Sequence, residues 1–110
     1  MPYPPAPFAD GESFLIEFPD FTPLITFHAN STLTVRIVAG DNAGFEEIVE
    51  YESVAVREGL VILSWREYIG STVVHALDLD SNNAYTVVTP AKGDLMRLQG
   101  SIRRLPPRKN

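Results

Sequence analysis

The chain has 110 residues, enough for one compact domain, and its 45% hydrophobic content favours a packed core over disorder. It has no cysteine, which excludes disulfides, a thiolate nucleophile and cysteine-based metal sites. The net charge of −5 argues against a nucleic-acid partner. Because no apolar run reaches membrane-spanning length and residues 1–11 do not resemble a secretory signal, we expect a cytoplasmic protein that does not contact membranes.

Short runs rich in Val, Ile, Thr, Phe and Tyr follow one another along the chain, separated by residues that tolerate tight turns. We interpret the acidic segment after Gly44 as a strand despite its helical composition, because it also alternates with period two. One helical turn near residues 8–12 is expected to plug one end of the fold. The predicted strands are Ser13–Phe18, Leu24–Ala29, Thr32–Val38, Phe45–Val56, Leu60–Arg66, Thr72–Leu77, Ala84–Thr89 and Asp94–Ile102.

Eight strands with short connections predict an all-β antiparallel meander, which can close into a small up-and-down barrel and so remove its edges. A barrel of this size is either just filled by side chains or holds one small ligand. The alternative is a two-sheet β-sandwich. We expect the barrel over residues 11–102, an extended proline-rich arm at residues 1–10, and a basic proline-containing tail at residues 103–110.

Residues 65–78 read as one β-hairpin that carries the main candidate site. Trp65 and Glu67 share a parity and so point to the same side of their strand, while His75 lies among apolar residues on the other strand. A buried glutamate has a raised pKa, and a histidine beside it stays cationic more easily, so such a pair can serve as general base and acid or bind a polar ligand. Whether all three side chains share a face depends on the hairpin register, which the sequence leaves open.

Few other residues suggest chemistry. Tyr51 and Tyr85 lie on predicted strands and can offer hydroxyl groups to a ligand, whereas Arg97 and His28 are expected to be solvent-facing. With only two histidines and no ligand motif, no metal site is predicted, and no glycine-rich loop of the phosphate-binding kind is present. We therefore expect no cofactor.

The charge is unevenly distributed. Residues 1–60 hold ten acidic and two basic residues, whereas residues 61–110 hold four acidic and seven basic residues. This asymmetry allows two copies to meet head to tail or across a two-fold axis, and a homodimer is one expectation.

The run W-x-E-x-x-G-x-x-V-x-H-x-x-D at residues 65–78 resembles the MoaF-like family. The resemblance covers roughly residues 11–102, and its opening G-x-x-F-x-I-x-F resembles the first strand of lipocalins and calycins. It implies a calycin-like barrel with a central cavity. Fuller members carry two such domains, which makes homodimerisation of this single module attractive. The function of the family is poorly defined, but its motif singles out Trp65, Glu67 and His75.

Three functions are compatible with these observations. In the first, the protein is a small-molecule binding module for a compact hydrophobic or aromatic ligand, which Trp65, Glu67, His75, Tyr85 and Tyr51 contact. In the second, it is a cofactor-free lyase, isomerase or cyclase in which Glu67 moves a proton with His75 or Tyr51 assisting, by analogy with the barrels of phenolic acid decarboxylases. In the third, the barrel is closed by its own side chains and acts as a dimerising interaction module.

Overall fold

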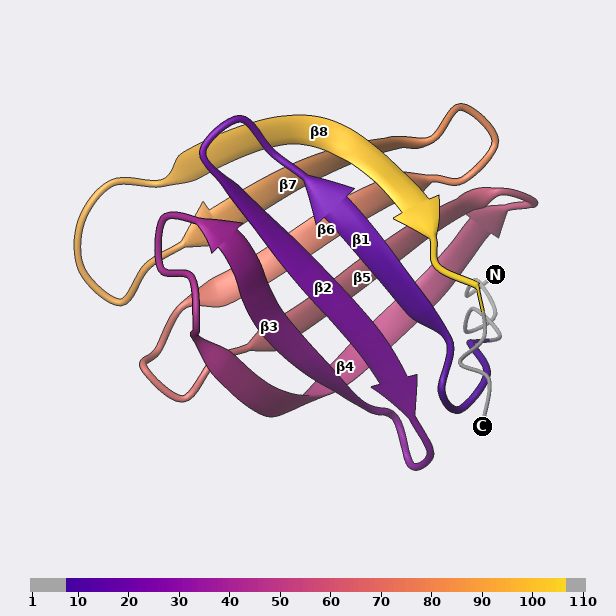
Figure 1. Ribbon diagram of the computed structural model, residues 1–110, viewed down its shortest axis with the longest axis horizontal. Coiled ribbons are helices and arrows are strands. Elements are labelled where there is room, and N and C mark those ends of the chain that lie inside the picture. The colour runs from indigo at the N-terminus through magenta and orange to yellow at the C-terminus, as the bar shows by residue number, and fades with distance from the viewer. Residues whose placement is uncertain (1–7, 107–110) are drawn as a thin grey trace.

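The computed structural model describes residues 8–106 and contains eight β-strands joined by short loops (Figure 1). All eight predicted strands are present. This part of the chain has no helix with the length and apolar character that crossing a membrane requires. The strands are β1 (Ser13–Glu17), β2 (Phe21–His28), β3 (Thr32–Gly40), β4 (Glu46–Arg57), β5 (Leu60–Arg66), β6 (Thr72–Asp78), β7 (Asn83–Thr89) and β8 (Met96–Arg104).

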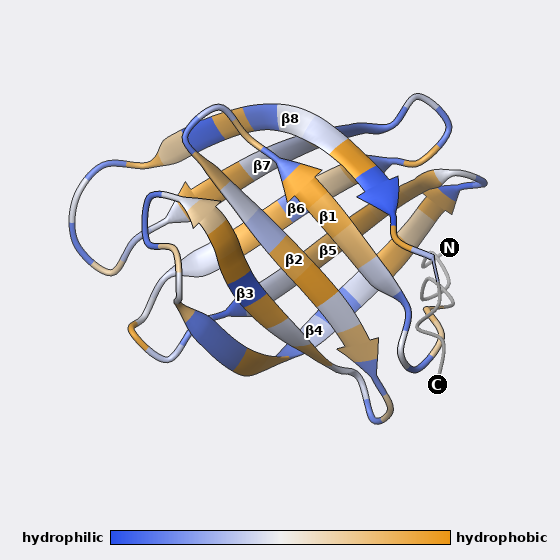
Figure 2. Ribbon diagram, in the orientation of Figure 1, coloured by the Kyte–Doolittle hydropathy of each residue, from blue (hydrophilic) through white to orange (hydrophobic). Residues whose placement is uncertain are grey.

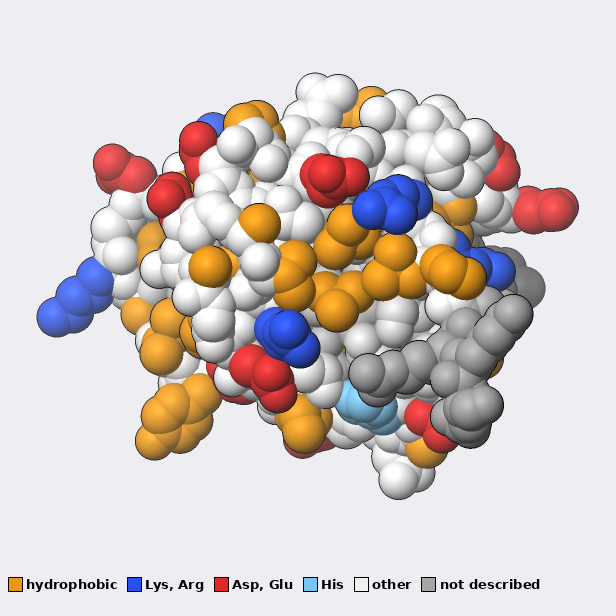
Figure 3. Space-filling view, in the orientation of Figure 1, with side chains coloured by type: hydrophobic (Ala, Val, Ile, Leu, Met, Phe, Trp, Pro, Cys, Tyr) orange, Lys and Arg blue, Asp and Glu red, His pale blue; other side chains and the backbone are white. Residues whose placement is uncertain are grey.

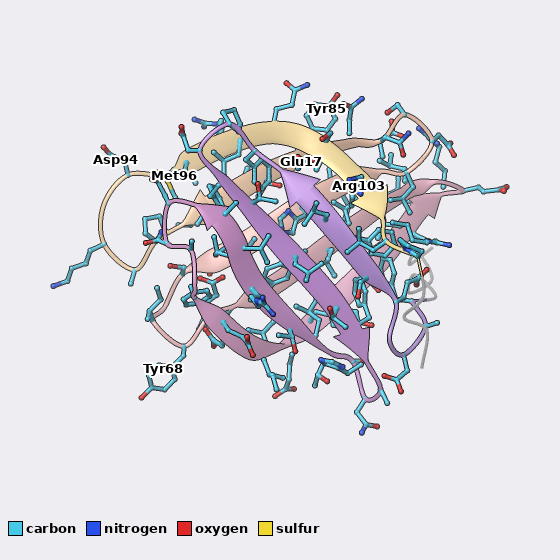
Figure 4. The ribbon with its side chains drawn as sticks, viewed as in Figure 1. Glu17, Tyr68, Tyr85, Asp94, Met96 and Arg103 are labelled. Carbon is cyan, nitrogen blue, oxygen red and sulfur yellow. The ribbon has the colours of Figure 1, made fainter. Side chains whose placement is uncertain are left out.

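The sheet closes on itself. Each strand pairs antiparallel with its neighbours in sequence, and β1 also pairs with β8, from Phe14 opposite Arg104 to Glu17 opposite Ser101. An exposed ion pair between Glu17 and Arg103, 3.7 Å apart, lies across this seam (Figure 4). The closed barrel confirms the predicted architecture, and the alternative of a two-sheet sandwich is wrong because no strand is left as an edge.

The interior follows from alternation along each strand. In β3, the side chains of Leu33, Val35 and Ile37 are buried, whereas those between them lie outside. Apolar and polar residues accordingly alternate along the ribbons (Figure 2). The long β4 pairs with its two neighbours along different halves of its length. Residues 46–50 pair with β3, and the residues from Tyr51 onward pair with β5.

One end of the barrel is filled by aromatic side chains. Phe8 stacks on Phe27 with ring centroids 4.0 Å apart and meets Phe14 edge-on at 5.9 Å. Residues 8–12 thus plug this end as expected, but they form a turn, in which the Glu12 amide donates to the Ala9 carbonyl, rather than a helical turn. The remainder of the predicted arm, residues 1–7, and of the predicted tail, residues 107–110, lies outside the described residues.

Seven of the eight strands have a boundary one to three residues from the predicted one, and two of these differences have a clear physical reason. β2 begins at Phe21, ahead of Pro23, because a register shift between Thr22 and Pro23 accommodates the missing amide hydrogen. β8 extends to Arg104, two residues beyond the expected end of the barrel, because it pairs with β1 up to that residue. The extension takes Arg103 and Arg104 out of the expected tail and into the sheet.

Gly100 is required where β8 passes the end of β1. A Cβ atom at this position would collide with the Glu17 carbonyl and crowd the Phe18 ring. The missing side chain therefore lets Phe18 turn into the interior, where it is 6% exposed.

We expect Gly100→Ala to lower the free energy of unfolding by about 2 kcal/mol, because the collision involves backbone that cannot move without opening the seam. Urea unfolding followed by Trp65 fluorescence measures the change. Ser101→Ala, at the adjacent exposed position, is the control and should change stability little. Equal stability of the two variants would contradict the packing described at the seam.

Candidate functional site

The interior contains a cavity of about 350 Å³. It opens at the end of the barrel that carries the loops β1–β2, β3–β4, β5–β6 and β7–β8, on the left in Figure 1. The interior is thus not filled by its own side chains, in contrast to the interaction-module hypothesis. Most of the lining is apolar, and the polar groups are few: Asn42, Glu67, Ser71, His75 and Thr86.

His75 is buried in the wall of this cavity. On β6 it lies opposite Leu63 of β5 and Thr86 of β7. Its side chain points inward and is only 2% exposed. Its Nδ1 atom lies 2.6 Å from the Thr86 hydroxyl, whereas Nε2 has no hydrogen-bond partner among residues 8–106. Burial away from water lowers the pKa of His75 to about 3, so the ring is neutral at physiological pH.

Trp65 and Glu67 lie beside His75. The Trp65 ring packs on the imidazole with centroids 4.9 Å apart, and its Nε1–H donates to Glu67 Oε2 at 3.2 Å. Desolvation raises the pKa of Glu67, the hydrogen bond from Trp65 partly offsets this rise, and the nearby charge of Glu47 adds to it. The site therefore places an aromatic surface, a neutral imidazole and a carboxyl group along one apolar cavity.

The β5–β6 turn holds Glu67 at the cavity opening. The Glu67 amide donates to the Ser71 carbonyl at 2.8 Å, and the Glu67 carbonyl accepts from the Gly70 amide at 2.8 Å. Glu47 supports the same turn from β4 by accepting from the Tyr68 amide at 2.7 Å. The register that results, with Trp65 opposite Val73, directs Trp65, Glu67 and His75 into the same interior, which the sequence left open.

His75 was expected to stay cationic more easily beside a buried Glu67, and this expectation is wrong. No hydrogen bond or ion pair joins Glu67 to His75 among the described residues, and the desolvated imidazole is neutral rather than cationic. The physical reason is the neighbourhood of each group. His75 is surrounded by apolar side chains and one hydroxyl, whereas the acidic group is paired with the Trp65 indole instead.

The two tyrosines lie away from the cavity. Tyr51 faces the interior but packs near the plugged end, 5.2 Å from the Phe27 ring, where burial raises its pKa. Tyr85 was expected to contact a ligand, but it is 47% exposed and points outward (Figure 4). The reason is alternation on β7, since Ala84 and Thr86 on either side of it are buried.

Several cavity residues were not predicted from the sequence. Thr86 shares the inward parity of Ala84, and this alternation is the sequence signal that could have identified it. A threonine in a strand does not by itself indicate a site, because its hydrogen-bond partner lies on another strand. Five more lie at strand ends or in the adjoining turns, where parity is ambiguous. Together with the exposed Tyr68 they make the open end of the barrel apolar (Figures 3 and 4). These lining residues are Phe18, Phe21, Phe45, Ile69 and Met96.

Other expectations concern groups outside the cavity. Arg97 is exposed, and His28 is half-buried on the outer face, where its Nε2 atom lies 2.7 Å from the Thr34 hydroxyl. Within residues 8–106, no group of three or more His, Asp or Glu side chains is arranged to hold a metal ion.

Comparison with known proteins identifies relatives in family and in structure. The MoaF-like family model matches residues 10–103. A crystal structure from Burkholderia vietnamiensis, described as "a putative beta-lactamase", is similar with a TM-score of 0.85 and 30% sequence identity, over 96% of this chain and 100% of that chain. No functionally curated protein matches the sequence.

We expect His75 to make the protein less stable as the pH falls from about 6.5 toward 3. The unfolded chain takes up a proton near the ordinary pKa of 6.5, whereas the folded protein does so only near 3. The unfolded state therefore binds more protons in this window, and stability falls by up to about 1.4 kcal/mol per pH unit. Glu67, with a raised pKa, acts in the opposite direction.

The test compares the native protein with the double variant His75→Phe, Thr86→Val, which removes both hydrogen-bond partners and leaves neither unpaired. Urea unfolding at about pH 7 and about pH 4.5 should show a larger loss for the native protein than for the variant. Because Glu67 is common to both, the difference isolates His75. Equal losses would show that His75 is not buried in the neutral form.

Proposed function

This chain belongs to the MoaF-like family, and we propose that it is a small-molecule binding protein whose ligand is compact and hydrophobic or aromatic. The observation that carries the proposal is the cavity of about 350 Å³ inside a closed barrel, lined mainly by apolar side chains and open at one end. Its size lies at the lower end of the range found for small-molecule sites.

The polar groups of the cavity fit an orienting role. Apolar walls supply affinity without direction, whereas a few fixed polar atoms select one orientation of the ligand. Trp65 offers an aromatic surface, and His75 and Glu67 place hydrogen-bonding atoms in the wall and near the opening. The aromatic plug around Phe8 leaves the opposite end as the entrance.

The Burkholderia vietnamiensis protein is described as a β-lactamase, and the residues of the present chain do not support that activity as an alternative. The present sequence contains no S-x-x-K, the nucleophile motif of class A serine β-lactamases. The described residues also include no group of three potential metal ligands. The cavity and its lining therefore remain the observations that carry the proposed function.

Filling the cavity should weaken binding of a probe. We expect Val73→Phe to weaken binding of the neutral fluorescent probe N-phenyl-1-naphthylamine about tenfold or more, because Val73 is 5% exposed and lines the cavity. The control is Val74→Phe, the same substitution at the next residue, which faces outward and is 37% exposed. Probe fluorescence should saturate with the native protein and the control. No saturable signal with either would count against a binding cavity.

A second candidate function is cofactor-free proton transfer by Glu67. The observation that favours it is a carboxyl group with a raised pKa in an apolar cavity, the environment that makes a carboxylate a stronger base. His75 would then orient substrate rather than shuttle a proton, because it is neutral and not joined to Glu67.

The probe 5-nitrobenzisoxazole tests this activity without knowledge of the natural substrate. A base removes its ring C–H proton, the N–O bond breaks, and a nitrile and a coloured phenolate form. We expect Glu67 to accelerate the reaction on the order of a hundredfold over buffer, and Glu67→Gln to abolish the acceleration. Glu52→Gln, the same substitution at an exposed position of β4, is the control and should keep the native rate. Equal rates for native protein and Glu67→Gln would exclude Glu67 as a base.

A further inference from the structure

The most unusual atom of the cavity wall is His75 Nε2. It is buried, and no residue from 8 to 106 supplies it with a hydrogen-bond partner. Nδ1 is hydrogen-bonded to Thr86 on the neighbouring strand, which fixes the ring, and His75 is one of the residues that line the cavity. An unpaired buried polar atom in a cavity is a place where a ligand gains affinity by supplying the missing partner.

The tautomer of His75 follows from the hydrogen-bond network rather than from an observed hydrogen. Thr86 is 3% exposed, and its hydroxyl has His75 Nδ1 as its one side-chain partner in the described chain. If Nδ1 donated, both the hydroxyl hydrogen and Nε2 would be unpaired. If the hydroxyl donates to Nδ1, only Nε2–H is unpaired, so this arrangement is preferred and Nε2 is a donor.

The charges around the cavity define what can approach this donor. Two carboxyl groups, Glu67 in the lining and Glu47 beside it, lie near the opening. No lysine or arginine is among the described residues that line the cavity. A ligand carboxylate would therefore lose its water without gaining an ion pair.

We propose that the ligand is an uncharged aromatic carbonyl compound, such as an aryl ketone, aldehyde or lactone, whose carbonyl oxygen accepts a hydrogen bond from His75 Nε2 while its ring packs against Trp65. This inference rests on the proposed binding function and narrows it to one ligand class. A carbonyl oxygen is a strong acceptor that carries no charge, so it satisfies the donor without an unpaired ion. A pure hydrocarbon leaves the donor unpaired, and an aromatic carboxylate is repelled by the carboxyl groups near the cavity opening.

Three ligands of similar shape separate these chemistries: 2-acetylnaphthalene, 2-isopropylnaphthalene and 2-naphthoate. Each is titrated against the native protein by displacement of N-phenyl-1-naphthylamine. We expect the ketone to bind roughly fivefold to tenfold more tightly than the hydrocarbon, the gain expected of one hydrogen bond. The carboxylate should bind most weakly of the three at neutral pH.

The chain provides a matched pair of variants. His75→Phe with Thr86→Val removes the donor and its partner while keeping an aromatic ring in the wall, and it should bind ketone and hydrocarbon equally. His28→Phe with Thr34→Val removes the other cross-strand His–Thr pair, which lies on the outer face, and should keep the native preference for the ketone. A second readout is the ¹⁵N and ¹H resonance of His75 Nε2–H, which should shift with the ketone and not with the hydrocarbon.

The outcomes distinguish the two proposals. If the probe does not bind, or none of the three ligands displaces it, the binding function itself fails. If the ligands bind but the hydrocarbon or the carboxylate binds as tightly as the ketone, only the carbonyl inference is overturned. An Nδ1–H tautomer in the nitrogen spectrum would overturn it as well, since Nε2 would then be an acceptor.

Discussion

Closure of the sheet between β1 and β8 is the constraint on which the rest of this structure depends. It removes both edges, so that all eight strands turn one face inward, and it makes the interior a single compartment. His75 on β6 and Trp65 on β5 both point inward, and they are buried together only because that compartment is enclosed. Gly100 connects closure to the site, since its small size lets Phe18 reach from the seam into the cavity wall.

The two ends of the barrel have different physical characters. At one end, the rings of Phe8, Phe14 and Phe27 fill the space between the strands. At the other end, no such plug is present among the described residues, and the opening is lined by hairpin loops with Glu67 held in place by its own turn. The chain thus closes one end with packed aromatic rings and leaves the other end open, with a carboxyl group near the opening.

Much of the fold could be predicted from the sequence, because period-two alternation and turn residues are local signals. They located all eight strands and favoured a barrel, although Pro23 obscured the start of β2 and pairing with β1 extended β8. Trp65, Glu67 and His75 were recognised, but their common face required the register of the β5–β6 hairpin, which depends on the whole ladder.

Other features of the site depend on contacts between distant residues, which no local pattern encodes. The neutral state of His75 follows from what surrounds it in space, and its pairing with Thr86 from the register of β7. Tyr85 was expected to face a ligand because it lies on a strand of the right composition. Its position between two inward-facing residues of β7 directs it outward instead.

The seam between β1 and β8 also determines how the barrel responds to mechanical load. It is the one strand pair in the described barrel that is not joined by a hairpin loop. Phe14 lies opposite Arg104, so the outer ends of both strands meet at the same point of the ladder, beside the Glu12–Arg104 ion pair. A force that pulls residues 12 and 105 apart therefore loads the hydrogen bonds one after another, as in a zipper, and not all together in shear. Such a barrel yields at low force, and it opens from the plugged end, away from the cavity entrance.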